Sequence, residues 1–171
     1  VLFGGAVALL PAFADQVLHT GPEGLGYLRS APALGAVMMA LVLAFRPPHK
    51  NAGRKMLICV AGFGICMIGF ALSTSFLLSF VLLMLSGMFD NVSVVIRSTI
   101  LQSFTPDEMR GRIAAVNSIF IGSSNELGAF ESGVTARLLG LTNSVIFGGA
   151  MTLVVVTITN KLAPTLKKLD L

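Results

Sequence analysis

Six apolar stretches follow one another along the chain, separated by short segments rich in glycine, proline, serine or charged residues. A helix that crosses a bilayer needs about 20 predominantly apolar residues. The pattern therefore predicts an all-α, polytopic membrane protein with six spans. We expect these spans to cover the following ranges: up to about 14, then about 27–45, 56–72, 76–102, 106–139 and 144–162.

The first apolar stretch is shorter than the others. It holds 14 residues, from Val1 to Ala14, before the chain reaches Asp15. At about 1.5 Å per residue such a helix is about 21 Å long, whereas the hydrocarbon core is about 30 Å thick. We therefore expect the first helix to be truncated at its start and residues 1–171 to be part of a longer protein.

Cap signals mark the two ends of the fifth span. Thr105 is a suitable N-cap, Pro106 suits the first helical position, and Glu108 completes a capping box. At the other end, Gly140 is a suitable C-terminal cap. The sequence therefore predicts a helix from about Pro106 to Leu139.

Composition supports the membrane interpretation. The chain is 54% hydrophobic and only 12% charged, whereas soluble domains carry about 25% charged residues. His19 and His49 both lie in predicted loops, no cysteine–histidine spacing suits a metal, and no phosphate-binding GxxxxGK[ST] motif is present. We therefore predict no metal, no cofactor and no enzymatic reaction.

The basic residues are distributed unevenly between the two predicted sides of the membrane. Nine of the twelve lie on the side that carries the loops 46–55 and 103–112 and the C-terminus: Arg46, Lys50, Arg54, Lys55, Arg110, Arg112, Lys161, Lys167 and Lys168. Only Arg29 and Arg137 lie on the other side. An excess of Lys and Arg marks cytoplasmic loops. The net charge of +4 is thus a topology signal, and we expect no nucleic-acid partner.

The fourth span carries Asp90, Asn91 and Arg97. A charged side chain at mid-depth in a bilayer costs about 3 kcal/mol or more, so it should face protein or water. Asp90 and Arg97 are seven residues apart, which places them on one face with about 10 Å of helical rise between them. Each charge should therefore meet a partner on another helix or an aqueous cavity. A charge network between helices and a substrate contact both remain open.

The fifth span is polar along one face. Asn117, Ser124 and Glu131 recur every seven residues, and we expect Glu126 about 100° from that stripe on the helical wheel. Asn125 is a further candidate in the same segment. Glycines at 122, 128 and 133 would let another helix approach closely. One interpretation is the wall of an aqueous translocation pathway, with an acid that carries a proton. The other is hydrogen bonding that only holds the bundle together.

Two segments resemble the major facilitator superfamily. The basic loop "RPPHKNAGRK", residues 46–55, resembles the signature that this superfamily carries between paired helices of each half. Residues 89–133, "FDNVSVVIRSTILQSFTPDEMRGRIAAVNSIFIGSSNELGAFESG", resemble the bacterial efflux branch that contains enterobactin exporters. The family pattern often has an acid at the position of Ala129, which is a departure in this chain.

The resemblance implies a fold and an activity. Residues 1–171 would be the C-terminal six-helix half of the transporter, helices seven to twelve, and a separate N-terminal half would close a central cavity. Arg54 and Lys55 would lie in a cytoplasmic gate, and Arg110 with Arg112 would latch the inner face.

We therefore expect a proton-coupled exporter of a small molecule, such as a siderophore or drug, in the inner membrane of a bacterium. Its partners would be the lipid bilayer, the solute, protons and the N-terminal half. The alternative is a self-contained six-helix protein that dimerises as a channel or scaffold. Six further spans upstream of Val1 would distinguish the two.

Overall fold

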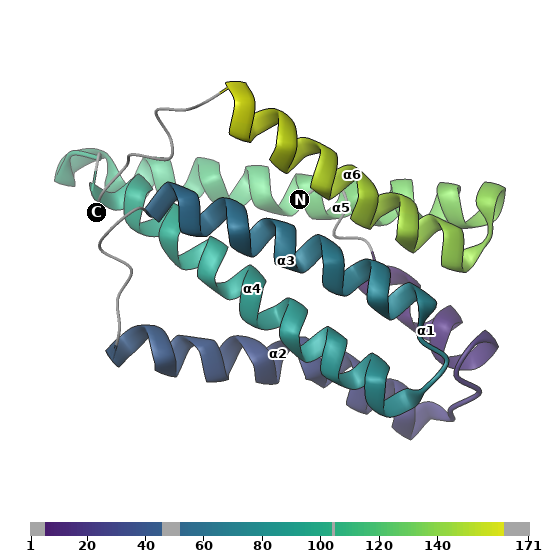
Figure 1. Ribbon diagram of the computed structural model, residues 1–171. Coiled ribbons are helices and arrows are strands. Elements are labelled where there is room, and N and C mark those ends of the chain that lie inside the picture. The colour runs from purple at the N-terminus through teal and green to yellow at the C-terminus, as the bar shows by residue number, and fades with distance from the viewer. Residues whose placement is uncertain (1–5, 46–51, 104, 163–171) are drawn as a thin grey trace.

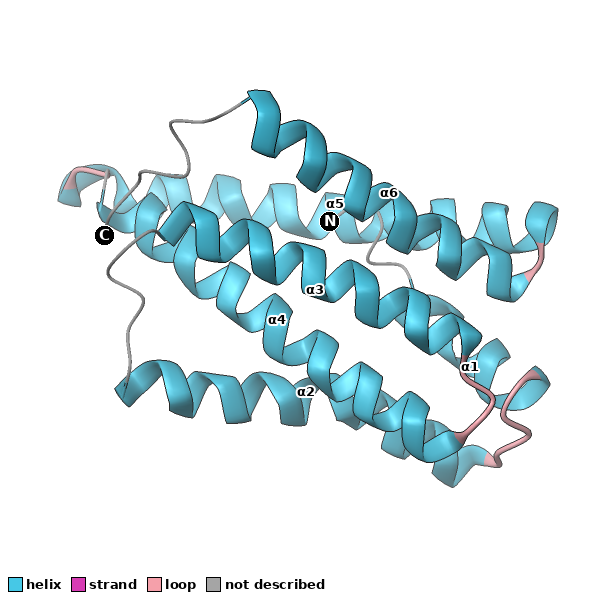
Figure 2. Ribbon diagram, viewed as in Figure 1, coloured by secondary structure: helices cyan, strands magenta, loops and turns pink. Residues whose placement is uncertain are grey.

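The computed structural model describes residues 6–45, 52–103 and 105–162. Within these ranges the chain consists of helices joined by short loops, with no strand (Figure 1; Figure 2). The elements are α1 (Ala6–Gln16), α2 (Pro22–Phe45), α3 (Ala52–Leu72), α4 (Phe76–Ser103), a 3-10 helix η1 (Asp107–Met109), α5 (Arg110–Leu139) and α6 (Leu141–Leu162). The predicted all-α fold class is confirmed.

Four of these helices, α2, α3, α4 and α6, are long and apolar enough to cross a membrane. α5 is longer than all four, at 30 residues, but it does not meet that criterion because its composition is too polar. α1 has 11 described residues and is too short. Length and composition thus identify four spans where the sequence pattern predicted six, and α5 depends on its neighbours to cover its polar groups.

The long helices run up and down, and the predicted basic side lies at one end of the bundle. Figure 1 shows that α2, α4 and α6 end at the same side, on the left, where α3 and α5 begin. Arg54, Lys55, Arg110 and Arg112 belong to those two beginnings, and Lys161 lies at the end of α6. Arg46, Lys50, Lys167 and Lys168 lie outside the described residues. The alternation predicted from the loops is therefore present in the described helices.

The main core lies toward the opposite end and is made by five helices. Its fully buried side chains include Leu10 and Phe13 of α1, Leu28 of α2, Phe70 of α3 and Leu83 of α4, and Val145 of α6 completes it. Phe13 and Phe70 pack with their ring centroids 4.5 Å apart. A second cluster, around Ala52, Val92 and Ile96, joins α2, α3 and α4. Among the described residues, α5 contributes none to either cluster.

Glycines bring the α2 and α4 backbones into direct contact. A Cβ on Gly87 would overlap the backbone of Pro32, and a Cβ on Gly35 would overlap the carbonyl of Met84. Small residues of this kind let helices approach closely in membranes. A similar approach joins α3 to α6, where a Cβ on Gly149 would lie 2.9 Å from the carbonyl oxygen of Gly64.

The outer surfaces of the helices carry large apolar side chains. Val37 and Leu41 of α2, Leu77 of α4 and Ile158 of α6 are exposed in the chain by itself. So many exposed apolar side chains on spanning helices need a cover, and a bilayer supplies one. The exposed residues therefore agree with the four spans identified by length and composition.

The start of α5 differs from the predicted one. Thr105 caps no helix; it is buried, and its hydroxyl donates to the Leu101 carbonyl at 2.5 Å. Pro106 has an extended ψ of 144° and precedes η1 without a side-chain cap. The capping box is therefore wrong, because a hydroxyl can bond back to the preceding helix as well as forward. At the other end, Gly140 is the predicted C-cap, with φ of 87° and its N–H donating to Ala136.

Candidate functional site

A cavity of about 320 Å³ lies in the middle of the bundle. Each of the six α-helices contributes to its wall, and three of the predicted site residues, Asp90, Arg97 and Asn125, line it. Its volume is at the lower end of the range for small-molecule sites, about 300–1,000 Å³. The remaining lining residues are Val7, Pro32, Val60, Phe63, Met67, Leu83, Ser86, Gly87, Phe89, Ser93, Val94, Ile121 and Thr152.

One face of α4 supplies the polar side of this cavity. Ser86, Asp90, Ser93 and Arg97 follow at intervals of four, three and four residues, which aligns them along a helix. Asp90 is exposed, Arg97 is half-buried, and Ser93 is buried between them. The two serines were not predicted as site residues, although this spacing around Asp90 was the signal that could have identified them.

Asp90 and Arg97 do not pair with each other. Across the described ranges the one salt bridge joins Arg110 Nη2 to Asp107 Oδ1, at 2.9 Å, outside the cavity. The separation expected from their spacing therefore holds. Both charges line the same cavity, and each keeps its capacity to bind a group of opposite charge.

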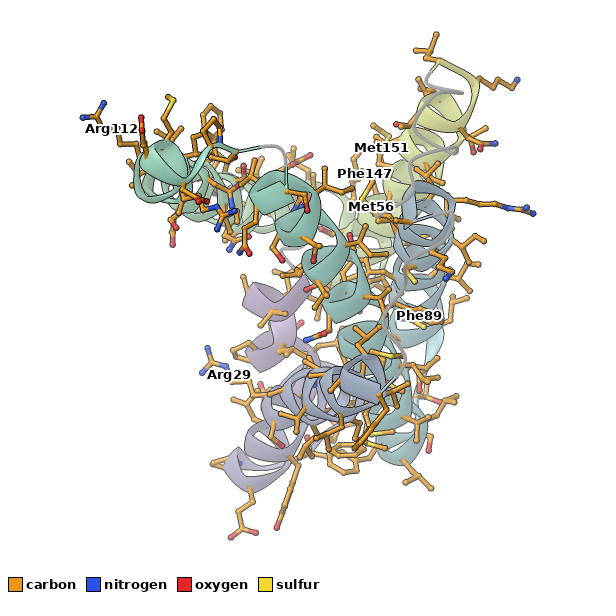
Figure 3. The ribbon with its side chains drawn as sticks, turned by 90° about the vertical axis from the view of Figure 1, so that its left-hand side faces the viewer. Arg29, Met56, Phe89, Arg112, Phe147 and Met151 are labelled. Atoms are coloured by element: carbon orange, nitrogen blue, oxygen red, sulfur yellow. The ribbon has the colours of Figure 1, made fainter. Side chains whose placement is uncertain are left out.

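Aromatic and aliphatic side chains form the rest of the wall. Val60, Phe63 and Met67 of α3 line it, as does Phe89 of α4. The Phe89 ring packs about 3.0 Å from the position that a Cβ on Gly62 would occupy, so α3 holds this ring closely. Figure 3, seen along the bundle from the basic end, places Phe89 between α4 and α3. The site thus combines two opposite charges with an apolar surface.

Asn91, which sequence reasoning grouped with Asp90, does not line the cavity. It lies about 100° further around α4 and is half-buried. Its Oδ1 atom is buried and has no hydrogen-bond partner among the described residues. The structure therefore separates Asn91 from the other two candidates of α4.

The predicted polar stripe of α5 lies on the face that looks toward the rest of the chain. Asn117, Ser124 and Glu131 are half-buried, and Gly128, the buried residue of this helix, lies on the same face. None of the three lines the cavity, which Ile121 and Asn125 reach from α5. The stripe thus faces the rest of the chain, is half-buried, and lies beside the α5 residues that reach the cavity.

Glu126 is exposed and lies on the opposite face of α5. The expected offset of about 100° is wrong, because two residues turn an α-helix by about 200° from Ser124. A Cβ added at Gly122 or at Gly133, which share that side of the helix, would meet nothing within 4 Å. The close helix approach predicted for these two glycines is therefore absent within the described residues. It is present at Gly35 and Gly87 instead.

Sequence reasoning missed a set of hydrogen bonds that joins α5 to α6. The hydroxyls of Thr135 and Ser144 are 2.6 Å apart, and Ser144 also donates to the Ser132 carbonyl at 3.2 Å. The hydroxyl of Thr135 lies 2.9 Å from the Glu131 carbonyl. Ser132 and Thr135 lie next to Glu131 on the helix, but these hydrogen bonds use no side chain of the stripe itself, so both interpretations of the stripe stay predictions.

The four gate candidates are exposed and lie at the basic end. Arg54 and Lys55 belong to the first turn of α3, and Arg110 and Arg112 to the first turn of α5. Figure 3 shows Arg112 pointing away from the bundle. None of the four lines the cavity.

No group of three or more metal-ligating side chains occurs among the residues for which the structure gives a placement. The charged groups of the cavity are a single carboxylate and a single guanidinium, which suit binding by ion pairing and hydrogen bonding.

Comparisons with known proteins identify related sequences. The sequence pattern of the family described as "Transmembrane secretion effector" matches residues 2–171. The Enterobactin exporter EntS of Shigella boydii serotype 18 is 34% identical over 105 residues, which are 61% of this chain and 25% of the relative. The proteins of the same name from Shigella flexneri and Escherichia coli O1:K1 are each 33% identical, over 63% and 61% of this chain and 26% and 25% of the relatives.

The chain spans about a quarter of the length of the curated relatives it matches. No solved structure gives a significant match. The resemblance predicted from the sequence is confirmed by the family match, which extends over nearly all of the chain.

Proposed function

Because the chain belongs to the transmembrane secretion effector family of the major facilitator superfamily, we propose that it forms part of a secondary transporter that exports a small organic molecule. Its place would be the inner membrane of a bacterium, with the lipid bilayer around it and a further six-helix half facing it. The curated relatives are named as enterobactin exporters, so a siderophore or another amphipathic compound is the substrate class proposed.

The cavity is the observation that supports this proposal. It collects Asp90, Arg97 and Asn125 from two helices in the middle of a bundle whose outer surface is apolar. Polar and charged groups in a spanning helix are costly unless they face protein or water, and they mark solute pathways in membrane proteins. A solute that enters the cavity can exchange water for these groups.

Export against a gradient needs an energy source, and we propose proton uptake through an acid of α5. Glu131 is half-buried on the face toward the chain, whereas Glu126 is exposed on the opposite face. A carboxyl group that alternates between water and a closed interface can change its protonation state with the conformation. Replacing each acid in turn therefore tests whether proton coupling takes place on the inner or on the outer face of α5.

The experiment compares Glu131→Gln and Glu126→Gln in the full-length protein, reconstituted in vesicles with an imposed pH gradient. We expect at least one variant to lower proton-driven efflux about tenfold or more while its amount in the membrane stays normal. Loss in Glu131→Gln alone favours coupling within this bundle, and loss in Glu126→Gln alone favours the outer face of α5. Normal efflux in both would remove the proton role from α5.

The basic end is proposed as the cytoplasmic gate. Arg54 and Lys55 on α3, and Arg110 and Arg112 on α5, are exposed at that end, where they could contact acidic groups of another element when it closes. Arg110 would then exchange its exposed pairing with Asp107 for such a contact. Replacing Arg110 and Arg112 by Gln together should lower efflux, with Arg29→Gln at the opposite end as the matched control. Equal efflux in both variants would contradict the gate.

A further inference from the structure

The two charges of the cavity suggest what kind of solute it binds, if the cavity is a solute site as proposed above. Asp90 and Arg97 line the same space and are not joined by a salt bridge. Charges that neutralise each other on one helix are three or four residues apart, where their side chains meet. A spacing of seven residues leaves about 10 Å of rise between them.

We propose that this cavity recognises a zwitterionic solute, whose cationic group binds Asp90 and whose anionic group binds Arg97. An ion removed from water needs an opposite charge to offset its desolvation. A zwitterion brings one partner for each group in a single molecule and leaves the net charge of the cavity unchanged. A solute with one charge would leave either the carboxylate or the guanidinium without a partner.

The remaining lining residues suit the body of such a solute. Ser93 lies between the two charges on α4, and Asn125 reaches the cavity from α5. The hydroxyl of Thr152 donates to the Gly148 carbonyl at 2.9 Å, so its oxygen is left as an acceptor. Phe63 and Phe89 offer aromatic surface. The expected solute is therefore an elongated, largely apolar molecule with its charges at opposite ends.

The volume limits its size. About 320 Å³ accommodates a molecule of two aromatic rings, so a probe of that size tests the cavity in this shape. A rigid probe of this kind is 4′-(aminomethyl)biphenyl-4-carboxylate. Its methyl ester carries only the cation, and its N-acetyl derivative carries only the anion. The one-ring homologue, 4-(aminomethyl)benzoate, has the same two groups closer together.

The experiment measures equilibrium binding of these four compounds to the full-length protein in detergent, without any gradient. The wild type should bind the two-ring zwitterion about tenfold tighter than the ester, the N-acetyl derivative or the one-ring homologue. Asp90→Asn should remove the preference over the N-acetyl anion, and Arg97→Gln the preference over the ester. Thr157→Val, which changes an exposed residue of α6 that bonds only its own helix, should leave all four affinities unchanged.

A double exchange, Asp90→Arg with Arg97→Asp, separates recognition from folding. It keeps both charges on the same face, so the preference for the two-ring zwitterion should return even if a single variant is poorly folded. Equal binding of all congeners by the wild type, no binding of any of them, or no return of the preference in the double exchange would each overturn the inference.

Transport is read separately from binding. A zwitterion that binds with the expected preference but is not moved in vesicles supports the recognition and contradicts the export proposed above. A congener that is exported without any preference for the zwitterion contradicts the recognition and leaves the export standing.

Discussion

α4 and α5 both carry charged and amide residues, yet the structure treats them differently. α4 packs extensively against both α2 and α3, and its charged face borders the cavity. α5 contacts mainly α6 and α1, and its buried surface is centred on one glycine, Gly128. Figure 3 shows α5 set apart from the α2–α3–α4 group. A polar residue in a spanning helix thus has a meaning that depends on the neighbours of that helix.

This difference in packing between α4 and α5 follows from the positions of their glycines. Gly35 and Gly87 let α2 and α4 touch through their backbones, and the neighbouring side chains then close around the cavity. A Cβ added to Gly122 or Gly133 of α5 would meet no described atom within 4 Å beyond the backbone of its own helix. Close packing holds the α4 charges in place, whereas α5 is joined to α6 by the hydroxyls of Thr135 and Ser144.

The largest expected effect tests this difference at the glycines. Gly87→Leu should lower the free energy of unfolding by about 3 kcal/mol, because the added atoms meet the Pro32 backbone, which cannot move aside as a side chain can. Gly122→Leu on α5 is the matched control and should leave stability unchanged or slightly higher, since leucine favours a helix over glycine. Thermal denaturation of the full-length protein in detergent gives both values.

Either of two outcomes would break the comparison. An unchanged melting temperature for Gly87→Leu would contradict the close crossing of α2 and α4. A strong loss for Gly122→Leu would show that another element of the full-length protein packs on the outer face of α5.

A smaller effect is expected where α3 meets α6. A Cβ on Gly149 would lie 2.6 Å from Ile68 Cγ1 and 2.9 Å from the Gly64 carbonyl oxygen. The isoleucine can shift, but the carbonyl cannot, so Gly149→Ala should cost about 1–2 kcal/mol of the free energy of unfolding. The cost of Gly149→Ala should be smaller when it is measured in an Ile68→Ala background, by comparing that single variant with the double variant in the same melting assay. No cost from Gly149→Ala alone would mean that α6 can move away from α3 freely.

The hydroxyls between α5 and α6 should matter less than the glycine contacts. A double-mutant cycle of Thr135→Val and Ser144→Ala should give a coupling of about 0.6–1.7 kcal/mol, the range of hydrogen bonds between membrane helices. Thr157→Val, whose hydroxyl bonds the Leu153 carbonyl of its own helix, is the control and should show no coupling with Ser144→Ala. A coupling near zero for the first pair would assign the α5–α6 contact to van der Waals packing.

Sequence reasoning located the ends of the helices better than their beginnings. The predicted ends at Phe45 and Leu72 agree with α2 and α3, but α2 begins at Pro22 and α3 at Ala52, four or five residues earlier than expected. Polar residues such as Glu23 and Arg54 belong to these helices while lying outside the apolar stretches. Hydropathy marks the part of a helix that suits lipid, and a helix continues beyond it into the polar boundary.

The candidate site was predictable where one helix determines it. The spacing of Asp90 and Arg97 placed both on one face, and the cavity borders that face. For α5 the sequence could not predict which candidates would line the cavity. Periodicity shows which residues share a face of a helix, but it does not show which other helix packs against that face. The structure places Asn125 in the cavity, Asn117, Ser124 and Glu131 toward the chain, and Glu126 on the opposite side.

The smallest expected effect concerns the surface before α5. The Asp107–Arg110 pair is exposed, with 84% and 57% of the two side chains accessible, although its atoms are only 2.9 Å apart. Exposed pairs three or four residues apart contribute about 0.5 kcal/mol or less because water screens them and both side chains lose freedom. Asp107→Asn should therefore leave the melting temperature within about 1–2 °C of the wild type. If Arg110 closes a gate as proposed, Arg110→Gln should lower efflux while changing the melting temperature equally little. A large loss of stability from either variant would show that the start of α5 packs against a further part of the protein.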